Sequence, residues 1–169
     1  VLLALAGLTT NSFLRTLNVD PGFDPSKTLA MRLTLPHQRY PNTILITGFF
    51  DEVIRRVEGL PGVTKAAAGS TYPPIFLGRT SAFEIEGEVY QTDQELPSAY
   101  LTIATEGYHE AVGIPLVQGR GFASRDTTET PRVAIINEAA VERYFETGEP
   151  IGRRLRAAED RPWVEIVGV

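Results

Sequence analysis

Histidine and carboxylate side chains are the groups in this sequence that could bind a metal or catalyse hydrolysis. The two histidines, His37 and His109, lie about seventy positions apart. A zinc site would need further His or carboxylate ligands nearby at helical or strand spacing, as in HExxH, and neither histidine has them. Both histidines are therefore predicted to be surface side chains, and no metal site is expected.

Three glutamates, Glu84, Glu86 and Glu88, alternate along an expected strand and would project from one of its faces. Carboxylates grouped in this way can bind a hard cation. A calcium loop would also mix Asp, Asn and Gly at short spacing, and that pattern is absent. The favoured interpretation is that these residues form the solvent face of the strand.

The basic residues include one local cluster, Arg153, Arg154 and Arg156, with Arg161 nearby. The chain has 16 basic and 21 acidic residues, a net charge of −5, and no basic arm. A nucleic-acid partner is therefore not expected. The arginine cluster is interpreted as a solvated strand face.

Glycines around Arg120 could suggest a phosphate-binding loop, because Gly119-Arg120-Gly121 brings two glycines together. No third glycine and no Lys-Ser/Thr pair follows at the required spacing, and no GxSxG elbow is present. The sequence contains no cysteine, which excludes thiolate catalysis and disulfides. We predict that the chain is not an enzyme and has no cofactor.

An apolar cluster in a loop is the candidate contact site for a partner. Its members are Tyr72, Ile75, Phe76 and Leu77, with Pro73 and Pro74 between them. Exposed apolar clusters often mark interaction surfaces. The alternative is that these side chains fold onto the core, and the residues alone do not decide between the two.

The first eight residues are apolar and uncharged, and the first charged residue is Arg15. A membrane-spanning helix needs ~20 such residues, so this run cannot cross a bilayer by itself. It also lacks the basic region and cleavage site of a signal peptide. It is either a buried core helix or the outer end of a transmembrane helix.

Hydrophobic periodicity predicts an α+β fold, a mixed α/β arrangement that begins strand, helix, strand and continues with antiparallel strands. The expected helices are 2–17, 43–60 with Asn42 or Thr43 as the cap, a short turn at 108–113, and a helix from Asn137 to about Phe145. The expected strands are 28–35, 63–71, 82–89, 99–105, 114–117, a central strand at 133–136, and a closing hairpin of 151–156 and 163–169.

Short motifs occur in one order along nearly the whole chain. They are Val19-Asp20-Pro21-Gly22-Phe23-Asp24-Pro25, Leu33-Thr34-Leu35-Pro36, Arg39-Tyr40-Pro41, Leu60-Pro61-Gly62-Val63, Gly107-Tyr108, Gly113-Ile114-Pro115-Leu116, Gly119-Arg120-Gly121-Phe122, Val133-Ala134-Ile135-Ile136-Asn137-Glu138, Pro150-Ile151-Gly152 and Val164-Glu165-Ile166-Val167-Gly168-Val169. This ordered set resembles the periplasmic core domain of MacB/FtsX-like ABC-transporter permeases. The resemblance is closest to the duplicated permeases of acidobacterial type.

The resemblance implies a domain organisation. Residues 1–19 would be the end of a transmembrane helix and a helical stalk. Residues 20–106 would form a porter-like β-α-β subdomain, to which strand 163–169 returns, and residues 107–162 a smaller mixed α/β subdomain. Domains of this family usually continue past the position equivalent to Val169.

The resemblance also implies a function for the parent protein. The parent would be an inner-membrane permease, dimeric in its permease units, with this domain on the periplasmic side. It would work with a separate or fused ABC ATPase and with a periplasmic adaptor or substrate protein. The domain would couple ATP hydrolysis to efflux or another periplasmic task by conformational change. The alternatives are a free-standing extracytoplasmic ligand- or protein-binding domain, and an uncharacterised hydrolase.

Overall fold

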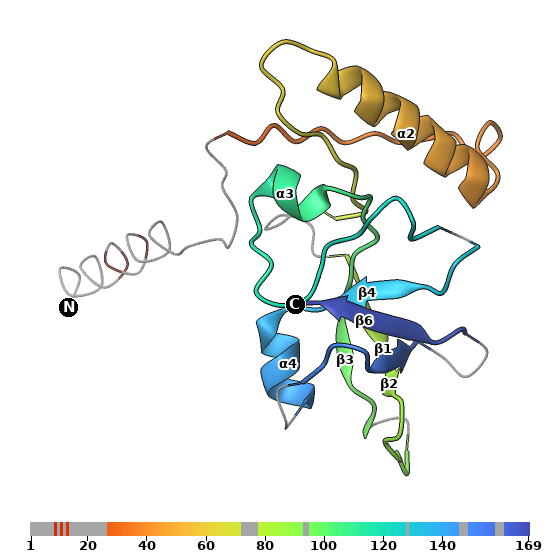
Figure 1. The fold of residues 1–169 in the computed structure, drawn as a ribbon, viewed down its shortest axis with the longest axis vertical. Coiled ribbons are helices and arrows are strands. Elements are labelled where there is room, and N and C mark those ends of the chain that lie inside the picture. The colour runs from red at the N-terminus through yellow and green to blue at the C-terminus, as the bar shows by residue number, and fades with distance from the viewer. Residues whose placement is uncertain are drawn as a thin grey trace.

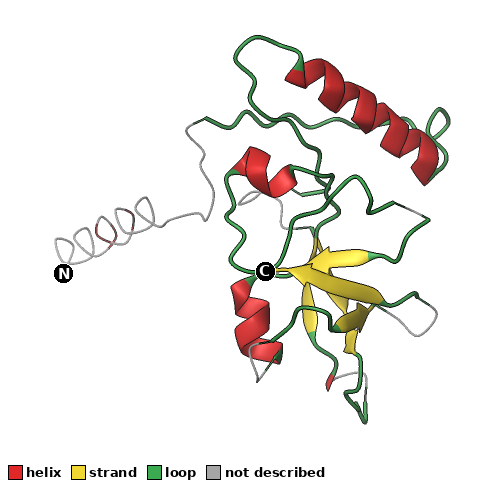
Figure 2. Cartoon of the chain, viewed as in Figure 1, coloured by secondary structure: helices red, strands yellow, loops and turns green. Residues whose placement is uncertain are grey.

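The structure is a computed structural model that describes residues 9, 11, 13, 27–71, 78–92, 95–127, 129–145, 149–157 and 161–169. Its two sheets have the strand orders β1-β3 and β2-β5-β6-β4. Figure 1 shows helix α2 at one end of the molecule, the four-stranded sheet and helix α4 toward the other, and helix α3 between them. Figure 2 shows the same mixture of helices and strands, which confirms the predicted α+β class.

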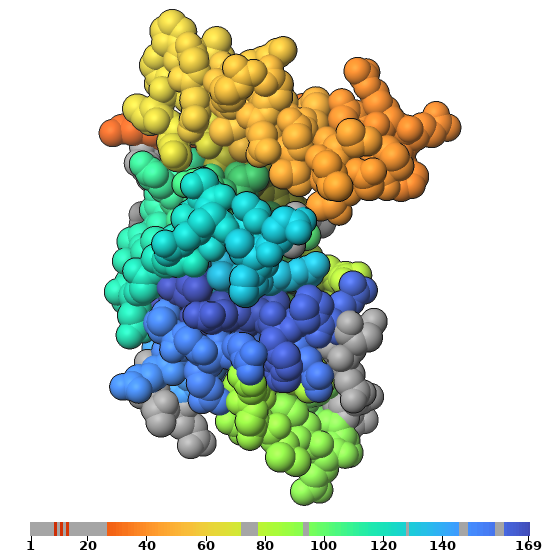
Figure 3. All heavy atoms as spheres, turned by 45° about the vertical axis from the view of Figure 1, so that its right-hand side comes forward, coloured from red at the N-terminus to blue at the C-terminus, as the bar shows by residue number. Residues whose placement is uncertain are grey.

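Helix α2 (Thr43–Glu58) forms where the sequence predicts its clearest helix. The side chain of Asn42 accepts a hydrogen bond from the backbone N–H of Leu45 (3.0 Å) and so caps the first turn. No residue of α2 is buried. Residues 28–36 are extended and run beneath the helix in Figure 1. We call α2 and residues 27–42 the α2 lobe, which forms the top of the molecule in Figure 3.

A two-stranded antiparallel ribbon follows the α2 lobe. Strand β1 (Arg79–Ala82) pairs with β3 (Ser98–Leu101). Beyond β3 the chain pairs with a different segment, because Ala104 forms an isolated antiparallel bridge with Gly69, which precedes β1. We count these paired residues, 68–71 and 102–105, as part of the ribbon. The ribbon leads into the short helix α3 (Tyr108–Val112), which lies between two glycines with positive φ, Gly107 and Gly113.

The four-stranded sheet contains β2 (Glu84–Ile85), β5 (Arg154–Arg156), β6 (Val164–Gly168) and β4 (Val133–Ile135). Strand β6 is antiparallel to β5 and parallel to β4. Helix α4 (Glu138–Tyr144) begins at Asn137, whose side chain accepts a hydrogen bond from the N–H of Ala140 (3.1 Å). We call this sheet and α4 the sheet body. The predicted cap at Asn137 and the predicted closing hairpin are both confirmed.

The core of the described residues lies in the sheet body. Ile85, Phe145 and Ile166 are 3%, 5% and 0% exposed and pack together. Partly buried side chains surround them, from β2, β4, α4 and β5 or the residues beside these elements: Phe83, Ile136, Val141, Tyr144 and Leu155. The strands of this sheet and helix α4 therefore share one apolar cluster.

The expected strand at 28–35 is not part of a sheet. Among the described residues, no backbone hydrogen bond joins 29–35 to another segment. Leu29 and Met31 are 96% and 71% exposed. Alternating apolar residues indicate a segment that can pair with a neighbouring strand. The described residues contain no strand that pairs with it.

Other strand predictions need correction. The expected strand 82–89 is divided between β1 and β2 because Phe83 turns toward the core, its N–H donating to the carbonyl of Pro97 (2.9 Å). Residues 63–71 and 114–117 form no regular strand. Strand β4 was expected to be central, but it ends the sheet and β6 lies inside it. An apolar run indicates burial of both faces and does not require a strand on each side.

Candidate functional site

The predicted contact residues Tyr72, Ile75, Phe76 and Leu77 lie outside the described residues. The residues that flank them are described. Thr71 is 5% exposed, and its hydroxyl is 2.7 Å from that of Thr102. The hydroxyl of the buried Tyr108 donates to the Thr71 carbonyl (3.3 Å). The chain is thus anchored to the ribbon and to α3 immediately before the predicted contact segment.

Gly78, which follows that segment, is also held closely. A Cβ placed on Gly78 would lie 2.6 Å from the Thr71 side chain and 2.9 Å from the carbonyl oxygen of Leu101. Its φ of +85° is in the region that favours glycine. Gly78 and Thr71 therefore bring the two flanks into contact, and a larger residue at position 78 would separate them.

The glutamate and arginine clusters form one ladder across β2 and β5 and the residues beside them. Glu84 accepts two hydrogen bonds from Arg156 (2.7 and 2.9 Å), Glu86 pairs with Arg154, and Glu88 lies 3.3 Å from Arg153. The hydrogen bond from Arg154 holds the pKa of Glu86 below its usual value. The carboxylates are thus neutralised by guanidinium groups, and the arrangement is a cross-strand ion-pair ladder rather than a cation site.

Aromatic rings hold the same arginines in place. The guanidinium group of Arg156 lies 4.7 Å from the Trp163 ring centre, and that of Arg153 lies 5.6 Å from the Phe145 ring centre. Because Phe145 belongs to the buried core, the ladder is connected to the interior of the sheet body. From the sequence alone, we interpreted each charge cluster as the solvent face of a strand. The period-two spacing of Glu84, Glu86 and Glu88, and that of Arg154 and Arg156, was the available sign of a cross-strand pairing.

The Gly119-Arg120-Gly121 motif serves a close backbone approach and does not form a phosphate loop. Gly119 and Gly168 form an antiparallel bridge. A Cβ on Gly119 would overlap the carbonyl oxygen of Val167, and a Cβ on Gly168 would overlap that of Arg120. Only glycine fits at both positions without a backbone shift.

Arg120 closes the loop that follows the motif. Its guanidinium group donates two hydrogen bonds to the carboxylate of Asp126 (2.7 and 2.9 Å). Asp126 also accepts a hydrogen bond from the backbone N–H of Ala123 (2.8 Å). The hydrogen bond from Arg120 holds the pKa of Asp126 below its usual value. The charges of Arg120 and Asp126 therefore neutralise each other within this loop.

The histidines differ from each other in their surroundings. His37 is exposed, as predicted, in the turn after Pro36. His109 is half-buried, with its ring near those of Tyr108 and Phe122 (5.7 and 5.9 Å between ring centres), and burial lowers its pKa. Within the described part of the chain, no group of three or more His, Asp or Glu side chains could hold a metal ion.

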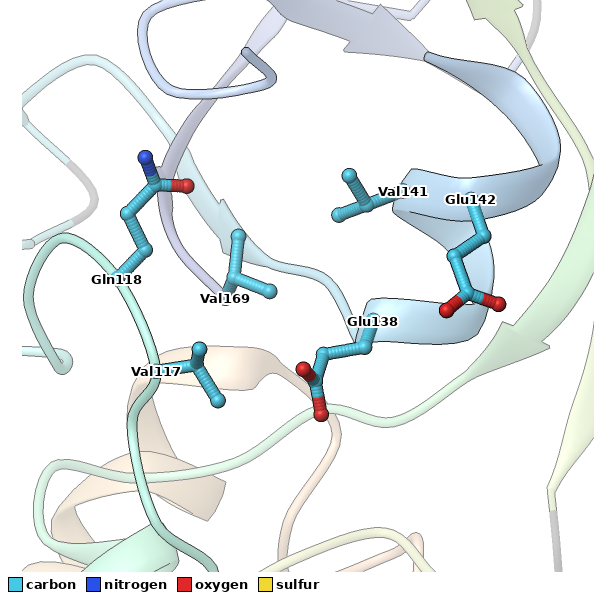
Figure 4. Close-up of a pocket in the computed structure, with 6 residues that line it drawn as sticks. All are labelled: Val117, Gln118, Glu138, Val141, Glu142 and Val169. Atoms are coloured by element: carbon cyan, nitrogen blue, oxygen red, sulfur yellow. The ribbon is translucent and has the colours of Figure 1, made fainter. Parts of the chain in front are cut away.

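Open cavities occur among the described residues, and two of them could be considered as binding sites. The first, of about 330 Å³, is lined by Val117, Gln118, Glu138, Val141, Glu142 and Val169. Figure 4 shows Glu138 and Glu142 projecting from α4, with the valines between them and Gln118. The second, of about 230 Å³, lies beside α2 and residues 105–106. Neither gathers the nucleophile, base and oxyanion donors that a hydrolase needs.

The family described as the MacB-like periplasmic core domain matches residues 8–169. The chain belongs to this family of MacB-like periplasmic core domains. The family is one of periplasmic domains of ABC-transporter permeases, and this match confirms the MacB-like resemblance inferred from the ordered motifs.

A solved MacB structure agrees with this fold, and a second solved domain is similar to a lesser degree. The periplasmic region of MacB from Actinobacillus actinomycetemcomitans is similar with a TM-score of 0.50 and 15% identity, over 70% of this chain and 49% of that one. A domain assigned to a permease from Porphyromonas gingivalis has a TM-score of 0.45 and 24% identity, over 68% of this chain and 46% of that one. No curated protein matches.

The MacB-like chain spans about half the length of the solved regions it matches. Among the described residues, no helix is long and apolar enough to span a membrane. A MacB-like periplasmic core domain belongs, by its family, to the periplasmic part of an inner-membrane protein.

Proposed function

We propose that this chain is the extracytoplasmic domain of an ABC-transporter permease subunit and that it transmits ATP-driven movement to efflux or another periplasmic task. The observation that carries the proposal is the family match over residues 8–169. The parent would sit in the inner membrane as a dimer of permease units. It would work with a separate or fused ATPase and with a periplasmic adaptor or substrate protein.

The architecture supports a mechanical role. A transmitting domain needs one part that stays rigid and another that can change position. The sheet body has a buried core and an ion-pair ladder, whereas the α2 lobe has no buried helical residue. We also retain the predicted organisation: a transmembrane end and stalk at 1–19, a porter-like subdomain at 20–106 with strand 163–169, and a second subdomain at 107–162.

The proposal is tested in the intact permease with its ATPase. In a cysteine-free background of the permease, to which this chain contributes no cysteine, spin labels are placed at Ile44→Cys on α2 and Ala139→Cys on α4, both exposed. ATP is expected to change the distance distribution between these labels. A control pair at Ala139→Cys and Ala157→Cys, both in or beside the sheet body, should not respond. Identical distributions with and without ATP for the first pair would overturn the proposal.

We further propose that Tyr72, Ile75, Phe76 and Leu77 contact the periplasmic partner. Support comes from the anchored flanks, since Thr71 and Gly78 fix where this apolar segment leaves the ribbon. Replacing Ile75, Phe76 and Leu77 with Ser in the intact permease should weaken partner binding and transport. Val89→Ser, at an apolar residue that is 90% exposed, is the control. Unchanged binding and transport in the triple variant would refute the contact.

A further inference from the structure

The α2 lobe joins the rest of the described chain through a short segment, residues 59–65. Beyond it the chain is firmly paired. The N–H of Ala68 donates to the hydroxyl of Thr105 (2.9 Å), and the N–H of Thr105 donates to the carbonyl of Ala68 (2.9 Å). The N–H of Ser70 donates to the carbonyl of Ile103 (2.8 Å). The rigid ribbon therefore begins at about residue 66, directly after this segment.

The joining segment is a short turn at the end of α2, in which the N–H of Val63 donates to the carbonyl of Leu60 (3.2 Å) around Pro61 and Gly62. Gly59 ends α2, and Gly62 has a φ of +86° with open space where a Cβ would be. Hinges are commonly a few residues at the end of an element that absorb changes in φ and ψ. Residues 59–65 have that position and composition.

Lys65 lies at the end of this segment and reaches both helices. Its ammonium group is 3.9 Å from a carboxylate oxygen of Glu58, in the last turn of α2, and 3.9 Å from one of Glu110, in α3. Its aliphatic stem crosses Gly107, where an added Cβ would overlap it. The same Glu58 oxygen accepts a hydrogen bond from the N–H of Ala66 (3.2 Å).

The rest of the boundary between α2 and the ribbon is loosely filled. The cavity of about 230 Å³ lies there, lined by Asp51, Ile54, Arg55, Glu58, Lys65, Ala66, Thr105 and Glu106. Most of the residues that line it are polar or charged, it is open to solvent, and no α2 residue is buried. Polar and open contacts of this kind can be exchanged for water at small cost.

We infer that Lys65 is a latch that sets the position of the α2 lobe on the ribbon and α3, with residues 59–65 as its pivot. This inference rests on the proposed function, because a latch matters only if the lobe moves. In the latched state the ammonium group holds Glu58 and Glu110 together. In the open state both carboxylates are hydrated and the lobe swings on the glycine-containing segment.

The experiment uses the intact permease with labels at Ile44→Cys and Ala139→Cys, without nucleotide. Lys65→Met keeps the stem over Gly107 and removes the charge. The open population should increase about two- to five-fold, since partly exposed ion pairs contribute little each. Glu110→Gln, at a 74% exposed side chain that cannot affect folding through the core, should shift the distribution the same way. Lys27→Met, at the other lysine of the chain, is the matched control.

The outcomes separate the latch from the proposed function. If Lys65→Met and Glu110→Gln leave the distribution as in the parent while ATP still changes it, the latch is refuted and the function stands. If the variants shift the distribution but ATP does not, the latch exists and the proposed function fails. A shift of equal size in Lys27→Met would show a general charge effect and would also refute the latch.

Discussion

In the sheet body Ile166 is fully buried and Ile85 is 3% exposed, whereas in the α2 lobe no helical residue is buried and Leu29 is 96% exposed. The sheet body therefore carries its own stabilising contacts within the described residues. The α2 lobe has the local signals of secondary structure but few contacts that fix it in place. We expect the same kind of substitution to have different consequences in the two regions.

The largest contrast should come from apolar truncation. Ile166→Ala removes a fully buried side chain at the centre of the core, and should reduce the free energy of unfolding by about 2–5 kcal/mol. Leu29→Ala removes an exposed side chain and should change it by less than about 0.5 kcal/mol. Denaturant unfolding of the two variants measures both values. Comparable losses of the free energy of unfolding would mean that Leu29 is covered in solution, and would contradict the contrast between the α2 lobe and the sheet body.

Crowding the backbone should have the next largest effect. Gly119 has a φ of +75°, so Gly119→Ala should cost about 1–2 kcal/mol of stability through left-handed backbone strain. The added methyl group would also press against the carbonyl oxygen of Val167, and this overpacking should cost a further ~1–3 kcal/mol. Gly62→Ala has a similar φ but open space, so only the first cost applies. Thermal unfolding should therefore show the larger shift for Gly119→Ala, and equal shifts would contradict the close approach to Val167.

Secondary structure with strong local signals could be predicted from the sequence. Asn42 and Asn137 do cap α2 and α4, and the closing hairpin forms as β5 and β6. Predictions that depended on a distant partner were less successful. Residues 28–35 alternate as a strand does, yet the described chain provides no strand beside them, because alternation specifies a face and not its neighbour.

The candidate site shows the same limit. The glutamates at 84, 86 and 88 and the arginines at 153, 154 and 156 were each interpreted as solvated, and they face each other across some 65 to 72 residues of sequence. Likewise, the spacing around Gly119 argued against a phosphate loop, but it could not show that Gly168 lies opposite Gly119. Residue type and spacing predicted no metal centre, but which charged side chains meet is decided by the strand register. The family resemblance depended on the order of short motifs along the chain, so it could be recognised without knowing which residues contact each other.

Helix caps offer a matched test of smaller size. Asn137→Ala removes the cap of α4, which packs on the core, and should lower global stability by about 0.5–2 kcal/mol. Asn42→Ala removes an equivalent hydrogen bond from α2. Because α2 has no buried residue, we expect faster hydrogen exchange in its first turns with little change in global unfolding. Equal losses in global stability would show that the lobe and sheet body unfold as one unit.

The smallest expected effect concerns two glutamates whose pKa values are lowered by arginine partners. The hydrogen bond from Arg154, 68 positions away, lowers the pKa of Glu86, and hydrogen bonds from Arg55 and Arg56, in the same helix, lower that of Glu52. Each pair stabilises the folded state fully above the unfolded-state pKa, about 4.3 for Glu, and this contribution is lost as the pH falls through the lowered folded-state value. Of these two pairs, only the Glu86 pair crosses the sheet body, from the residue directly after β2 to β5. Glu86→Gln should therefore weaken the dependence of the unfolding midpoint on pH below about 4.3 and on salt, whereas Glu52→Gln should affect only local exchange in α2. A midpoint that responds equally to the two variants would show that a local helical pair contributes as much as a cross-strand pair in this domain.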